Sequence, residues 1–197
     1  MSDPSIRCFL AVPVGERVRE ALARWLRTIR GRLPNARWVD PQHYHLTIKF
    51  FGEQPAAAVE RLAAALAGGV AGFGAFEVEI TGFGAFPGLD RPRVLWAGVG
   101  AGADDLRRLA GIVDAALVGR DIPADRRDFH PHLTLARFRV PARGRDLPPE
   151  VLQDLRRPWG RFEIDRVDLM QSRLTPNGAQ YSILHSFPLR APDPADS

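Results

Sequence analysis

The sequence of 197 residues has only one cysteine, Cys8, so it cannot form an internal disulfide. This scarcity is typical of proteins in reducing compartments, and we expect the protein to lie in the cytoplasm. Long hydrophobic runs are also absent. The apolar stretch at residues 9–12 is too short for the core of a secretory signal, and no segment approaches the length of a membrane span. We therefore expect no membrane partner.

Lysine is equally scarce, because Lys49 is the only one and the other 26 of the 27 basic residues are arginine. Arginine suits bidentate contacts with phosphate. The abundance of alanine, glycine and proline, however, indicates a base-composition bias that also favours arginine. The formal charge of +4 permits an anionic substrate without requiring one. With 45% hydrophobic and 25% charged residues, the composition is that of an ordinary globular protein.

The tripeptide His-Leu-Thr occurs twice, at residues 45–47 and at residues 132–134. Successive side chains of a strand point to opposite faces, so each histidine shares a face with its threonine while the leucine lies on the other. Two such strands side by side would present two imidazoles and two hydroxyls to one cleft. A single histidine in a strand is more often structural, but the repetition favours a functional site. Its predicted residues are His45, Thr47, His132 and Thr134.

Paired histidines suit a reaction in which one proton is removed and another is delivered. An unperturbed imidazole titrates at about pH 6.5, so one can be neutral while the other is protonated. The threonine hydroxyls can donate hydrogen bonds to phosphate oxygens as negative charge develops. No acidic cluster lies near either motif in the sequence, so we predict chemistry without a metal or other cofactor. A cyclic phosphodiester fits, because its strained ring supplies a leaving alkoxide for one histidine to protonate.

Hydrophobic periodicity predicts an α+β protein in which a similar order of elements occurs twice. The first half has a strand at residues 6–12, a helix at 16–31, the first motif strand, a helix ending at 68–69 and a strand at 76–80. The second half has a strand at 93–99, a helix at 106–117, the second motif strand and strands at 162–170 and 180–188. We expect two pseudo-symmetric lobes, each an antiparallel sheet with helices on its outer face, around a central cleft. Residues 1–190 are expected to form this single bilobal domain, and residues 191–197 a disordered tail.

Together with its flanking segments, the motif pair resembles a known family, the two-histidine (2H) phosphoesterases. Within it, the chain is most similar to the RNA 2′,3′-cyclic phosphodiesterases, also called LigT-type or 2′-5′ RNA ligase-like proteins. The resemblance covers nearly the whole chain and includes RCFLAVP at residues 7–13, HLTIKFFG at 45–52, GFGAFP at 82–87, PHLTLAR at 131–137, LMQS at 169–172 and GAQY at 178–181. It implies hydrolysis of an RNA 2′,3′-cyclic phosphate end to a 2′-phosphate. We expect a monomeric enzyme.

The resemblance also implies a role for each site residue. His45 would be the acid that protonates the departing 3′-oxygen, and His132 the base that activates water. Thr47 and Thr134 would hold phosphate oxygens, and Arg137 would add a charged contact. Strict alternation, however, places Arg137 on the leucine side of its strand, so it reaches the phosphate only if the strand bends or ends first. Members of the family also join RNA ends through a 2′-5′ linkage, and the sequence does not set that balance.

Two other functions stay open at this point. His43 and His130 each precede a motif histidine by two residues, and four histidines could bind a zinc-type metal with water as the nucleophile. Those four are His43, His45, His130 and His132. A non-catalytic RNA-end binder would instead use arginines and a stacking aromatic such as Phe9, Tyr44 or Trp38. In the cyclic phosphodiesterase that the resemblance implies, Phe9, Tyr44 and His130 are the candidates for contacts with the base or ribose.

Overall fold

Strands and helices follow one another much as the hydrophobic periodicity predicts, and the α+β class is confirmed. The computed structural model describes residues 5–120, 122, 129–175 and 178–191. In chain order the elements are β1 (Ser5–Pro13), α1 (Glu16–Ile29), η1 (Arg30–Arg32), β2 (Ala36–Trp38), η2 (Pro41–His43), β3 (His45–Pro55), α2 (Ala56–Val70), β4 (Phe76–Phe86), β5 (Val94–Val99), α3 (Ala103–Ala116), β6 (His132–Phe138), η3 (Gly144–Asp146), α4 (Pro149–Gln153), β7 (Pro158–Ile164), β8 (Arg166–Thr175) and β9 (Gly178–Pro188). None of the helices in these ranges is long and apolar enough to cross a membrane.

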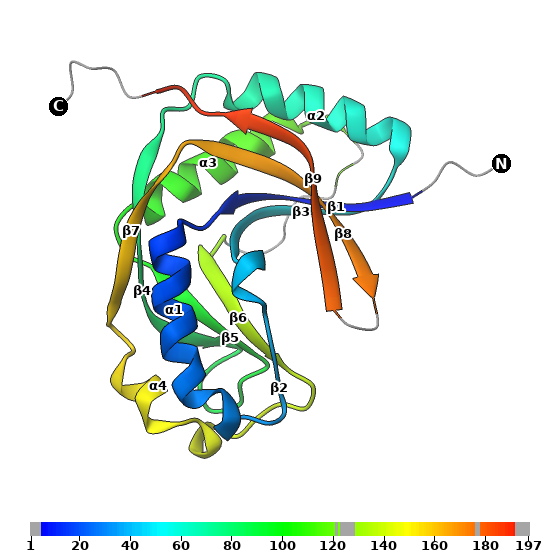
Figure 1. The fold of residues 1–197 in the computed structure, drawn as a ribbon. Coiled ribbons are helices and arrows are strands. Elements are labelled where there is room, and N and C mark those ends of the chain that lie inside the picture. The colour runs from blue at the N-terminus through cyan, green and yellow to red at the C-terminus, as the bar shows by residue number, and fades with distance from the viewer. Residues whose placement is uncertain (1–4, 121, 123–128, 176–177, 192–197) are drawn as a thin grey trace.

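The nine strands form one curled sheet in the order β7-β4-β5-β6-β3-β1-β8-β9, with β2 paired to β6 (Figure 1). Neighbouring strands are antiparallel. The two motif strands, β3 and β6, are neighbours in the middle of this order and pair through Leu46 and Leu133. The expectation of a separate sheet in each lobe is therefore wrong. Because the motif strands pair with each other, the strands of both halves join in a single sheet.

One face of this sheet is buried beneath the helices. Leu46 and Leu133 are 0% and 1% exposed, and they share one hydrophobic core with the buried sides of α1, α2 and α3. Figure 1 shows α2 and α3 packed beside each other over the sheet. The opposite face carries four partly exposed side chains, and we call it the motif face. These side chains are His45, Thr47, His132 and Thr134.

Several element boundaries differ from the sequence-based expectation. The strand predicted at residues 162–170 is two strands, β7 and β8, which are separated at Asp165 because β7 pairs with β4 and β8 with β1 in the opposite half. α2 continues through Gly68 and Gly69 to Val70, whose side chain is buried in the core. The predicted tail at 191–197 lies outside the described residues, apart from Ala191.

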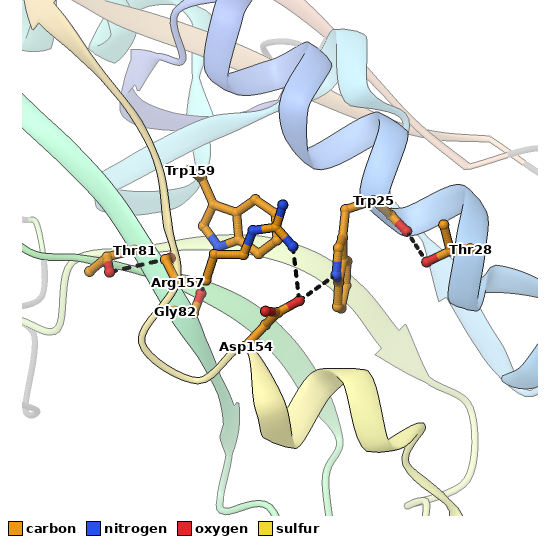
Figure 2. Close-up of polar contacts among 7 residues, drawn as sticks. All are labelled: Trp25, Thr28, Thr81, Gly82, Asp154, Arg157 and Trp159. Atoms are coloured by element: carbon orange, nitrogen blue, oxygen red, sulfur yellow. Dashed lines mark hydrogen bonds and ion pairs between the residues drawn. The ribbon is translucent and has the colours of Figure 1, made fainter.

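A cluster of side chains around Trp25 and Trp159 holds α1 against β4 and β7 (Figure 2). Trp25 of α1 donates its indole N–H to Asp154 Oδ2 at 2.7 Å, and Asp154 also pairs with Arg157 Nη1 at 3.3 Å. The Arg157 guanidinium lies 4.6 Å from the centre of the Trp159 ring. Trp159 in turn donates its indole N–H to the Gly82 carbonyl of β4 at 3.3 Å. This network fixes α1 on β4 and β7, at the end of the sheet away from the motif strands.

Candidate active site

The structure brings the two histidine–threonine pairs together on one face of the sheet. β3 and β6 are adjacent, and the pairing of Leu46 with Leu133 makes the residues on either side of these leucines neighbours across the strands. The charge of His132 reaches His45 closely enough to lower the pKa of His45. Both motifs therefore contribute to one site.

Each motif histidine is held by a backbone carbonyl two residues earlier. Nδ1 of His45 lies 2.8 Å from the carbonyl oxygen of His43, and Nδ1 of His132 lies 2.7 Å from that of His130. A carbonyl oxygen can only accept, so Nδ1 carries the hydrogen in both rings. Nε2 is therefore the atom that takes or gives a proton in each imidazole. The two histidines therefore have the same tautomer when neutral.

The pKa of both motif histidines is lowered from the ordinary value of 6.5. The largest cause is burial, which removes solvation from the charged imidazolium. The hydrogen bonds to the carbonyls of His43 and His130 oppose this shift, and the positive charge of Arg137 adds to it for both rings. The free site consequently binds protons weakly. An anion between the rings would raise both pKa values again.

A β-bulge turns Arg137 toward the motif face. In the pairing of β5 with β6, Leu95 lies opposite Ala136 and Trp96 opposite Thr134, which leaves Leu135 as the extra residue. Leu135 and Ala136 are consequently both buried, and Arg137 is exposed. The strand therefore departs from strict alternation, and the charge of Arg137 acts on both motif histidines.

β3 has a bulge at the equivalent place. Leu10 of β1 pairs with Lys49 and Ala11 with Thr47, which leaves Ile48 as the extra residue. Lys49 is thereby turned inward, where it is 3% exposed and its ammonium lies 2.7 Å from Asp114 of α3. Phe50 then occupies the place in β3 that Arg137 has in β6, the fifth residue after the motif histidine.

Aromatic rings surround His45. The centroid of the Phe9 ring lies 5.0 Å from that of His45, and Tyr181 of β9 lies 5.3 Å from both His45 and His43 in edge-on geometry. No sequence pattern places Tyr181 here, because it comes from a strand at the edge of the sheet. These rings restrict the orientation of the imidazole.

Aromatic rings also surround His132. The Phe86 ring lies 4.9 Å from His132, and the Trp96 ring lies 5.0 Å from His130. The Trp96 indole lies across Gly84, its register partner in β4, where an added Cβ would come within 2.1 Å of the ring. Only glycine leaves room for the indole at this position. Gly84, which lies between Phe83 and Ala85 in β4, was the sequence signal for this arrangement.

Two of the three expected base or ribose contacts are not available in this arrangement. Phe9 is 1% exposed and Tyr44 is 4% exposed, so neither ring presents a surface on which a base could stack. Phe9 supports His45, and Tyr44 lies on the same side of β3 as the buried Leu46. His130, the third candidate, is exposed beside Trp96.

The four-histidine metal site has no geometric support. Within the described ranges, which include all four histidines, no three side chains of histidine, cysteine, aspartate or glutamate converge as metal ligands. The described residues therefore do not form a set of metal ligands at this site.

Comparison with known proteins assigns the family. The family model for the 2′-5′ RNA ligase superfamily matches residues 18–175, which include both motifs. A curated RNA 2′,3′-cyclic phosphodiesterase from Aeropyrum pernix is 40% identical over 156 residues, which are 75% of this chain and 82% of that protein. One from Thermus thermophilus is 37% identical over 197 residues, with 94% of this chain and 91% of that protein covered.

The fold also matches that of a solved structure. A crystal structure of a Thermus thermophilus protein matches with a TM-score of 0.79 and 30% identity, covering 94% of this chain and 99% of that one. The family model and these relatives cover most of the chain, including both motif strands. This chain belongs to the 2′-5′ RNA ligase superfamily.

Proposed function

We propose that this protein hydrolyses the 2′,3′-cyclic phosphodiester at an RNA end, or in a nucleoside 2′,3′-cyclic phosphate, to a 2′-phosphomonoester. The observation that carries the proposal is the pair of imidazoles on one face of the sheet, each with its Nδ1 hydrogen held by a backbone carbonyl. Two such groups can serve as an acid and a base in one reaction. The substrate class comes from the relatives, which are RNA 2′,3′-cyclic phosphodiesterases.

In the proposed reaction, His132 takes a proton from water through Nε2 as the water oxygen attacks phosphorus. The bond between phosphorus and the 3′-oxygen breaks, and His45 gives its Nε2 proton to that oxygen. The products are a 2′-phosphate and a free 3′-hydroxyl, and both histidines then exchange protons with solvent. The assignment of the acid to His45 follows the family pattern. No metal or other cofactor takes part in these steps.

Three other side chains would stabilise the charge that develops on phosphorus-bound oxygens. Thr47 and Thr134 lie on the same face as the imidazoles and can donate their hydroxyl hydrogens to the non-bridging oxygens. Arg137 lies within electrostatic reach of both imidazoles and adds a positive charge. If a 5′-hydroxyl of a second RNA end replaces water, the same steps give a 2′-5′ linkage.

We further propose that the strands on the β6 side and on the β3 side form two pseudo-symmetric lobes of one domain at residues 1–190, with the substrate between them. The protein would act as a monomer in the cytoplasm. Sedimentation velocity would test the oligomeric state.

Turnover of the four nucleoside 2′,3′-cyclic phosphates in the presence of EDTA tests the proposal. We expect hydrolysis that EDTA does not reduce and that added zinc or manganese does not increase. Activity that is lost in EDTA and restored by a metal would support a metal-dependent hydrolase instead. Binding without turnover would support an RNA-end binding protein.

A further inference from the structure

Two arginines lie side by side on the motif face, near the end of β6. Arg37 of β2 pairs in register with Arg137 of β6. Paired residues on antiparallel strands point to the same face, and Ala36 and Trp38 on either side of Arg37 pack against the core. Arg37 therefore shares the motif face with Arg137, and both side chains are exposed.

These two positive charges have no counter-charge among the residues that the structure describes. Neither guanidinium has an ion-pair or hydrogen-bond partner in the part of the chain that the structure describes. Arginines elsewhere, such as Arg32 and Arg161, do pair with a carboxylate. Like charges in register on neighbouring strands repel each other, so the pair favours an anion bound beside it.

Arg37 lies farther from the histidines than Arg137 does. β2 pairs only with residues 136–138, whereas His132 begins β6. The charge of Arg137 lowers the pKa of His45 and of His132, and the charge of Arg37 is not among the causes for either. A phosphate between the imidazoles would therefore be within reach of Arg137, while Arg37 would meet a different phosphate.

Two exposed apolar side chains lie on the opposite side of the site. Phe50, which occupies in β3 the place of Arg137, is 54% exposed, and Ile183 of β9 is 55% exposed. Register links these two residues through Phe9 and Met170, so they share one face. An RNA end that crosses the site would meet two arginines in register on the β2 and β6 side, whereas the β1 and β9 side combines these apolar residues with the exposed Arg7 of β1. This difference favours the β2 and β6 side for the following phosphates.

We propose that Arg37 binds the phosphate on the 5′-oxygen of the terminal nucleotide, while Arg137 assists at the cyclic phosphate. This inference rests on the proposed function and specifies its substrate. The preferred substrate is then a nucleotide that carries a 5′-phosphate, either as the link to a preceding nucleotide in RNA or as a 5′-monoester. A nucleoside 2′,3′-cyclic phosphate has no group for Arg37 to bind.

The test compares three substrates that share one terminal nucleotide: the nucleoside 2′,3′-cyclic phosphate, its 5′-phosphorylated form and a dinucleotide. For Arg37→Gln, we expect the ratio of kcat/KM for the dinucleotide to that for the nucleoside cyclic phosphate to fall about tenfold, and the salt dependence of dinucleotide binding to weaken. Arg37→Lys should lose less, because it keeps the charge. Arg61→Gln on α2, also exposed, is the matched control and should leave the ratio unchanged. Circular dichroism melts check that each variant is folded.

A similar fall for the 5′-phosphorylated nucleotide would assign Arg37 to any 5′-phosphate, and a fall for the dinucleotide alone would assign it to the RNA link. Equal losses on all three substrates, or no change, would overturn the inference. If the wild-type protein turns over none of them, the proposed function fails. In that case, fluorescence anisotropy with a labelled RNA 3′-phosphate compares the RNA affinity of the wild-type protein with that of Arg37→Gln. Equal affinity of the two proteins would overturn the inference about Arg37.

Discussion

Leu46 and Leu133, the middle residues of the two His-Leu-Thr motifs, pair with each other across β3 and β6. Antiparallel pairing at this point sets His45 across from Thr134 and His132 across from Thr47. Each imidazole thus has a hydroxyl of the other motif beside it. A phosphate at the centre of these four groups would meet an acid, a base and two donors at once.

Removal of either motif histidine tests their catalytic roles. His45→Ala and His132→Ala should each lower kcat by about 10²- to 10⁴-fold, because each removes one group that transfers a proton. The double variant should lose less than the product of the two single losses, since both act in one reaction. Steady-state kinetics on a nucleoside 2′,3′-cyclic phosphate measures this. Near-normal kcat in either single variant would contradict the assignment.

The lowered histidine pKa values predict an acidic pH optimum. The base must be neutral, so kcat/KM falls toward low pH as it binds a proton, and the acid must be protonated, so kcat/KM falls toward high pH. Both pKa values lie below 6.5 in the free protein, mainly because the rings are buried. The bell-shaped profile of kcat/KM should therefore centre on the acidic side of 6.5.

The profile of kcat should centre at a higher pH than that of kcat/KM. The bound phosphate is an anion, so it favours the imidazolium form and raises both pKa values in the complex. Measurement of both profiles with one substrate checks the shift. A kcat/KM optimum on the alkaline side of 6.5 would contradict the role of two buried histidines.

Substitution of Gly84 should disturb the His132 side of the site. In Gly84→Ala the new Cβ would come within 2.1 Å of the Trp96 ring and displace it from beside His130 and His132. We expect about a 10- to 100-fold loss of kcat, because a misplaced catalytic group loses alignment. The free energy of unfolding should fall by about 1–3 kcal/mol.

Gly68→Ala in α2 is the matched control for this substitution, because an added Cβ there meets nothing within 4 Å. It should leave kcat unchanged and stabilise the helix by about 0.5–1 kcal/mol. Urea unfolding and kinetics on both variants make the comparison. Full activity in Gly84→Ala would show that the Trp96 position is not needed.

Local sequence patterns were enough to predict the strands that carry the motifs and the face on which each histidine lies. Alternation in the two His-Leu-Thr segments depends only on residues next to one another, and burial of both leucines follows from it. The bulge at Leu135 was not predicted: strict alternation placed Arg137 on the leucine side, and a bend of the strand was named only as the condition for Arg137 to reach the phosphate. The equivalent bulge in β3 could not be predicted either, because a lysine in a strand normally indicates an exposed position. The burial of Lys49 depends on its ion pair with Asp114 of α3.

The rest of the site depends on contacts between segments that are distant in the chain. Tyr181 reaches His45 only because β9 follows β8 along β1, and Trp96 reaches His130 only because β5 pairs with β6 and β4. The register of Arg37 with Arg137 likewise needs the pairing of a three-residue strand, which no periodicity predicts. The single sheet was missed for the same reason.

The identity of the product tests the central claim most directly. Acid and base lie on different strands, so water can attack in line with only one ester oxygen, the one nearest the acid. With His45 as the acid beside the 3′-oxygen, phosphorus NMR of a reaction with a nucleoside 2′,3′-cyclic phosphate should show the 2′-phosphate alone. A predominant 3′-phosphate would contradict the orientation proposed for His45 and His132.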